Sequence, residues 1–161
     1  MDAALKFLKG FEKTFVVTLT IAMVFVTFLQ VIFRVFLDNP LAWSEELSRY
    51  LFVWIVFIGG AWAVSGDAHF KMDFLTTVVP DKYKKVLDIF SSICMIAFAL
   101  IMVVYGWRLA MSVNTQLSPA LRVKMTIPYS ALPISGLLII IHAVELIISN
   151  VKKPKLNGKE D

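Results

Sequence analysis

Four long apolar segments constrain the fold more than any other feature of this sequence. They lie at about residues 14–37, 47–66, 86–111 and 128–149. Each is close to the ~20 residues that an α-helix needs to span a bilayer. Within the first segment, Val16 to Leu29 contains only threonines as polar residues, which is too little for the solvated stripe of a soluble helix. We therefore predict an all-α integral membrane protein with four transmembrane helices in a single domain, residues 1–161.

The composition agrees with this class, because 58% of the residues are hydrophobic and 17% are charged. Soluble domains are nearer about half apolar and about a quarter charged. The first apolar segment exceeds the ~7–15 residues of a signal-peptide core, and no small-x-small cleavage site follows it. We therefore expect a retained anchor. The lone Cys94 can form neither an internal disulfide nor a metal site by itself, and we interpret it as a packing residue.

The basic residues predict the orientation of the chain. Eleven of the sixteen lysines and arginines lie at the two termini and in the loop between the second and third segments. The remaining five lie in the other two loops and their flanks. By the positive-inside rule, the N-terminus and the C-terminus should both be cytoplasmic. The loops at 38–46 and 112–127 should then face outward.

The expected helices run at about 14–37, from 40 or 47 to 66, 82–111 and 128–149. Asn39-Pro40 is a good helix start, because asparagine caps the first turn and proline fits its first position. We expect an interfacial helix at residues 1–13, where lysines interrupt the apolar residues, or around residues 40–46. Pro133 should bend the last helix, and residues 150–161 should form a mobile tail.

A charged group marks the outer boundary of the first two spans. Glu45 and Glu46 can share one helical face with Arg49, which follows at helical spacing. Arg34 ends the first span, and an arginine near hydrocarbon is costly unless it is paired or reaches the interface. We expect a structural clamp or partner interface formed by Arg34, Glu45, Glu46 and Arg49, with Trp43 at the depth where tryptophan is enriched.

Small residues in the second span favour close helix packing. Gly59, Gly60 and Ala63 form this patch, and the four-residue spacing of Gly59 and Ala63 lets helix backbones approach. The patch could pack within the bundle or against a partner protein. After the span, His69 and Asp73 are four apart at the inner boundary, where we expect a structural latch because too few ligands for a metal lie nearby.

His142 and Glu145 are the ionisable pair of the last span. Both lie within about two turns of its cytoplasmic end, so we interpret them as side chains that snorkel to the interface. Haem ligation by two histidines is disfavoured, because His69, the only other histidine, lies beyond its apolar span. We expect no catalytic residue, cofactor or metal in this chain.

Several transport features are missing from the sequence. The first three spans have no acidic residue in their central turns. No matching pair of glycine- or proline-broken segments points to a transporter substrate site, and there is no Walker motif. These absences favour a supporting membrane subunit. Two alternatives stay open: a membrane anchor of a redox enzyme and a small self-assembling multidrug exporter.

The string LQVIFRVFLDNPLAWSEELSRYLFVWIVFIGGAWAVSGDAHFKMDFL resembles the small, Q-type membrane subunit of tripartite ATP-independent periplasmic (TRAP) transporters. The segment TIPYSALPISGLL resembles the start of that family's last helix. The resemblance covers most of residues 15–149.

This resemblance implies a non-catalytic subunit in the bacterial inner membrane. It implies a large permease subunit that binds sodium and substrate, and a periplasmic binding protein that delivers an organic acid such as a dicarboxylate or a sialic acid. The small subunit would brace the large one and help dock the binding protein.

Overall fold

The computed structural model describes residues 2–39, 41–65 and 81–152. The helices are α1 (Asp2–Phe36), α2 (Ala42–Ser65), α4 (Asp81–Ser112), α5 (Thr126–Tyr129) and α6 (Ala131–Lys152). Four stretches of this described part are long and apolar enough to cross a membrane: Ala4–Phe36, Ala42–Ser65, Ile89–Ser112 and Thr126–Ile148. The predicted all-α fold with four spanning helices is confirmed. His69 and Asp73 lie outside the described residues.

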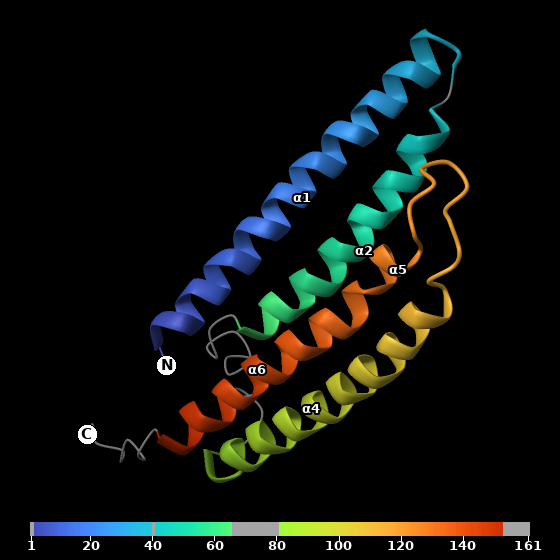
Figure 1. Ribbon diagram of the computed structural model, residues 1–161. Coiled ribbons are helices and arrows are strands. Elements are labelled where there is room, and N and C mark those ends of the chain that lie inside the picture. The colour runs from blue at the N-terminus through green and yellow to red at the C-terminus, as the bar shows by residue number, and fades with distance from the viewer. Residues whose placement is uncertain (1, 40, 66–80, 153–161) are drawn as a thin grey trace, which may run out of the picture.

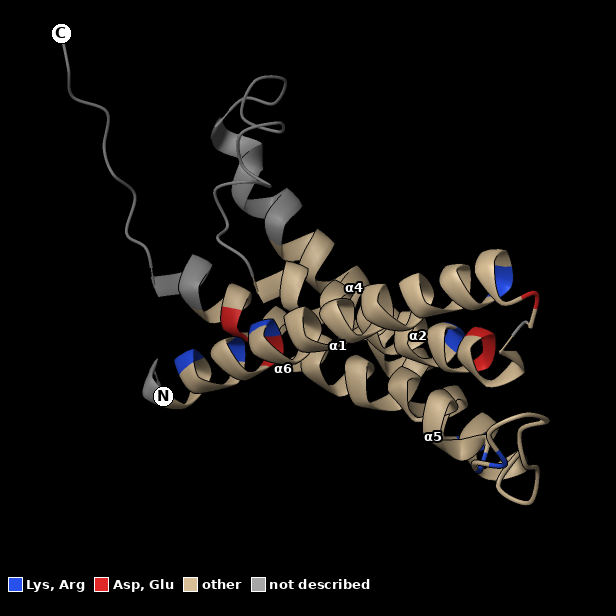
Figure 2. Ribbon diagram, turned by 90° about the horizontal axis from the view of Figure 1, so that it is seen from above, with Lys and Arg blue, Asp and Glu red and all other residues tan. Residues whose placement is uncertain are grey.

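The four long helices form a row that is one helix thick. Its order is α1, α2, α6, α4, so that consecutive helices in the row pack side by side (Figure 1). Along the helix axes, the layer has two ends. The start of α1 and the end of α6 lie at one of them, called here the terminal end. The loop between α4 and α5 lies at the opposite end, called here the loop end. Charged residues of the described chain lie mostly towards these two ends (Figure 2).

Small residues bring α4 and α6 close together. A Cβ atom built at Gly106 would lie 2.9 Å from Leu132 Cβ, and one built at Gly136 would lie 3.0 Å from the carbonyl oxygen of Ala99. At both positions a Cβ atom would force its neighbours to shift, so glycine permits this approach. Ala99 itself is fully buried in the contact.

The ends of the helices differ from the predicted bounds. Residues 2–13 continue α1 without a break, so they form no separate surface helix; the 35-residue helix is about 52 Å long, more than the ~30 Å of hydrocarbon. Residues 42–46 are the first turn of α2. The last span is interrupted at Ser130, between α5 and α6. This position precedes Pro133, whose missing N–H weakens the regular helix there.

Candidate functional site

At the loop end, Glu46 of α2 holds the loop that joins α4 to α5. Its Oε2 atom accepts hydrogen bonds from the backbone N–H groups of Ala120 (2.8 Å) and Leu121 (3.0 Å). Its Oε1 atom accepts one from the hydroxyl of Tyr50, whose oxygen also lies 3.2 Å from Met125 Sδ. An ionised carboxylate has enough lone pairs to accept all three bonds. These five residues are the Glu46 cluster, and they fasten the loop to α2.

The loop has internal structure of its own. Leu117 and Lys124 form an isolated antiparallel bridge, and the N–H of Ser118 donates to the carbonyl of Val123 at 2.9 Å. Arg122 has a φ of 56°, a left-handed conformation that is uncommon outside glycine. The loop is therefore a folded hairpin-like segment, and Glu46 satisfies two of its backbone donors.

The other predicted clamp residues lie near this cluster without joining α1 to α2. Arg49 Nη2 lies 3.0 Å from Glu45 Oε1 in an exposed pair on one face of α2. Trp43 is exposed in the first turn of α2. Arg34 is exposed, and no hydrogen bond or ion pair connects it to the acidic residues within the described chain. The expected contact of Arg34 is therefore not made, and Glu46 ties α2 to the loop instead.

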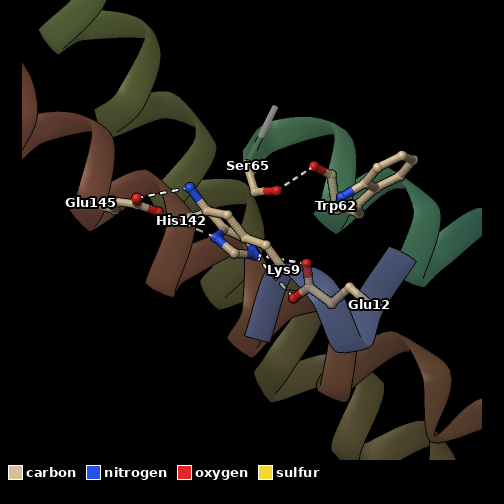
Figure 3. A network of polar contacts seen from close by, with 6 residues as sticks. All are labelled: Lys9, Glu12, Trp62, Ser65, His142 and Glu145. Atoms are coloured by element: carbon tan, nitrogen blue, oxygen red, sulfur yellow. Dashed lines mark hydrogen bonds and ion pairs between the residues drawn. The ribbon is translucent and has the colours of Figure 1, made fainter. Parts of the chain in front are cut away.

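A second polar group lies at the terminal end and joins α1 to α6. Nε2 of His142 is 3.0 Å from both carboxylate oxygens of Glu12, and Lys9 Nζ donates to Glu145 Oε1 at 2.8 Å. Figure 3 shows these four side chains, the His142 cluster, between the helices. When Glu12 is ionised, its carboxylate only accepts hydrogen bonds, so Nε2 is then the donor of this pair. Nδ1 faces Glu145 Oε2 at 3.7 Å and has no hydrogen bond.

The prediction that His142 snorkels to the interface is wrong. Its side chain is 0% exposed and that of Glu12 is 1% exposed. The cause is that α1 begins at Asp2 and not near residue 14. Glu12 therefore belongs to this helix and lies at the depth of His142. One signal was present in the sequence: Lys9 with Glu12 and His142 with Glu145 are two pairs at the same spacing of three, with complementary charges.

The predicted small-residue patch on α2 contributes little to packing within the chain. A Cβ built at Gly59 would meet Val16 of α1 at 3.8 Å, which is ordinary contact, and one at Gly60 would meet nothing within 4 Å. Ala63 is exposed, whereas its neighbour Ala61 is fully buried. Gly60 and Ala63 therefore face away from the other described helices, and their packing against a partner stays a prediction.

The middle of the layer offers few groups that could bind a polar solute. On α1, the hydroxyls of Thr18, Thr20 and Thr27 each donate to the carbonyl four residues earlier, at 2.8 Å. Within residues 2–39, 41–65 and 81–152, no three His, Cys, Asp or Glu side chains are placed to hold a metal ion. In the described chain, the polar side chains of the Glu46 cluster and the His142 cluster tie helices and a loop together.

The sequence matches the family model of the DctQ component of tripartite ATP-independent periplasmic transporters over residues 23–153. The chain belongs to this family. It is a TRAP transporter small permease subunit, a non-catalytic transport component and a multi-pass protein of the bacterial inner membrane. The resemblance seen in the sequence is confirmed.

Three relatives show the extent of the similarity. A TRAP transporter small permease protein of Haemophilus influenzae is 32% identical over 80% of this chain and 77% of its own length. The sialic acid small permease protein SiaQ of Vibrio cholerae is 25% identical over 91% of this chain and 85% of its own. The sialic acid permease protein SiaT of H. influenzae is 26% identical over 94% of this chain, which spans 24% of SiaT.

Proposed function

We propose that this subunit braces a large permease subunit in a sodium-coupled secondary transporter that imports an organic acid. The observation that carries the proposal is the row that is one helix thick. In the most apolar window of α1, 6% of the residues are buried inside the chain. Its exposed face includes Phe25 and Phe28. A partner subunit can pack along this face, as helices in a membrane associate by side-chain packing.

The fused relative supports a large permease as that partner. In SiaT, a sequence similar to 94% of this chain forms about a quarter of a longer permease. The middle of the described layer has few free polar groups, so the partner would have to bind the solute. Relatives named for sialic acid and for C4-dicarboxylates favour an organic acid as that solute. The family resemblance supports sodium coupling as part of this proposal.

The charge distribution supports an orientation with both termini in the cytoplasm. The loop end would then face the periplasm, with the Glu46 cluster holding the loop at 113–125 in a fixed shape. This surface would be available to a periplasmic binding protein. Arg122 and Lys124 are exposed on it and would complement an acidic patch on that protein.

Reconstitution tests the proposal. Liposomes containing this subunit alone should take up neither sialic acid nor a C4-dicarboxylate. Adding the large permease and its binding protein should give uptake of the cognate acid that requires a sodium gradient. Uptake by the small subunit alone, or full sodium-dependent uptake by the other two components without it, would overturn the bracing role. Uptake that does not respond to sodium would overturn the coupling.

A further inference from the structure

The pair of Glu12 and His142 is shielded from solvent, although both side chains are ionisable. The side chain of His142 is 0% exposed and that of Glu12 is 1% exposed. The other two members of the cluster reach the surface and pair with each other, since Lys9 and Glu145 are 30% and 28% exposed and lie 2.8 Å apart. Their opposite charges cancel. The net charge of the cluster is therefore set by the protons that Glu12 and His142 hold.

The helices around the pair add no further charge to it within the described residues. From α2, Ser65 and Trp62 lie in this region, and the Ser65 hydroxyl donates to the Trp62 carbonyl (Figure 3). The described side chains of α4, from Ile89 to Ser112, include one charge, Arg108, towards the loop end. The other lysines of α1 are exposed. Without a proton on the pair, its carboxylate would be a buried anion with no compensating charge, which is costly.

The second ring nitrogen of His142 points to the same conclusion by geometry. Nδ1 is buried without a hydrogen bond, 3.7 Å from Oε2 of Glu145. If the pair held no proton, the single ring hydrogen would lie on Nε2, facing Glu12, and the lone pair of Nδ1 would face another acceptor. With one proton, Nδ1 carries a hydrogen in both arrangements: an imidazolium beside a carboxylate, or a neutral ring that accepts at Nε2 from protonated Glu12. A donor then faces the Glu145 carboxylate.

We propose that Glu12 and His142 form a buried proton-binding site that holds one shared proton at neutral pH. The proton makes the cluster neutral, and a shift of about 0.8 Å would give Nδ1 a normal hydrogen bond to Glu145. On release, the proton passes to water at the surface-exposed side of Glu145, and an ionised Glu12 and a neutral His142 remain. Because this pair joins α1 to α6, the attachment of α1 at the terminal end weakens when the proton is lost.

Nitrogen-15 NMR of the histidine rings tests the site in the full chain in lipid bilayers. The protein is labelled with ¹⁵N-histidine, and a His69→Gln variant identifies the signals of His142, because these are the two histidines of the sequence. At neutral pH, Nδ1 of His142 should carry a hydrogen. At alkaline pH it should become a bare nitrogen, with the hydrogen on Nε2. A bare Nδ1 at neutral pH would overturn the proposal.

The pH dependence of folding counts the proton. Above about pH 6.5, free glutamate and histidine side chains hold no proton, whereas the folded pair keeps one, so stability should fall as the pH rises. The folding constant, from reversible unfolding in SDS, should fall by up to about tenfold per pH unit.

Two variants show whether this slope belongs to the pair. Glu12→Gln should lose the slope, because an amide does not hold the proton, and the matched control Glu45→Gln, at an exposed position, should keep it. Equal slopes in Glu12→Gln and the wild type would overturn the proposal. The NMR measurement leaves both residues of the pair unchanged, so it decides the question if Glu12→Gln does not fold.

Discussion

Nε2 of His142 lies 3.0 Å from both carboxylate oxygens of Glu12, although 130 positions separate the two residues. Their helices α1 and α6 are not neighbours in the row, and α2 lies between them. The side chains of this pair, together with Lys9 and Glu145, are therefore the direct connection between the two helices in the described chain (Figure 3). This connection fixes α1 to the rest of the layer at the terminal end.

Removal of one partner from this pair should destabilise the subunit. Glu12→Leu or His142→Leu leaves the other polar group buried without its partner, which costs about 3 kcal/mol or more. The double variant Glu12→Leu/His142→Leu should be more stable than either single variant, because no polar group is stranded. Thermal unfolding of the purified protein in detergent measures the stability of all three variants.

The exposed pair of Glu45 and Arg49 supplies the control for this prediction. Glu45→Leu removes an ion pair whose side chains are both 69% exposed, and such pairs contribute little. Its unfolding temperature should stay close to that of the wild type. If His142→Leu is as stable as Glu45→Leu, the buried pair does not stabilise the fold.

The Glu46 cluster predicts a local effect on the loop. Glu46→Ala removes the acceptor for the amides of Ala120 and Leu121, so these amides should exchange with deuterium faster than in the wild type. Exchange measured by mass spectrometry on peptides covering residues 113–125 tests this. Glu45→Ala is the matched control, and equally fast exchange in both variants would argue against anchoring by Glu46.

The number of spanning helices could be predicted because each apolar segment is about as long as a bilayer is thick. The order of the helices in the row could not be predicted. Apolar residues cover most of each helix, so periodicity does not identify the face that packs against a neighbour. Ser92, Ala99 and Gly106 follow one another at intervals of seven on α4 and are all buried. That spacing indicates a packing face on α4, but it does not show that the face meets α6.

The partners of the residues in the polar clusters could also be predicted only in part. The proximity of Glu45, Glu46 and Arg49 in sequence was informative, and Glu45 does pair with Arg49. The partners of Glu46 are backbone amides of a loop about 75 residues away, and backbone donors carry no sequence signal. The role of Glu12 is not predicted, because residues 1–13 are expected to lie on the membrane surface, whereas residues 2–13 are part of α1.

The close contact of α4 with α6 predicts which glycines tolerate a side chain. Gly136→Ala would place Cβ 2.9 Å from Val103 Cγ2 and 3.0 Å from a backbone oxygen, so the helices would have to move apart. Such overpacking costs about 1–3 kcal/mol. Gly60→Ala should have no such effect, because nothing lies within 4 Å of its Cβ. Unfolding temperatures in detergent compare the two, and equal stability would contradict the close packing.

The orientation of the chain can be tested by thiol labelling in intact cells. In a Cys94→Ser background, Gln116→Cys places a thiol in the exposed loop at the loop end, and Lys6→Cys places one on exposed α1 at the terminal end. Because the lysine-rich regions should be cytoplasmic, a membrane-impermeant maleimide added to spheroplasts should label Gln116→Cys. It should label Lys6→Cys only after the membrane is broken. The opposite pattern would reverse the orientation and place the loop at 113–125 in the cytoplasm, out of reach of a periplasmic binding protein.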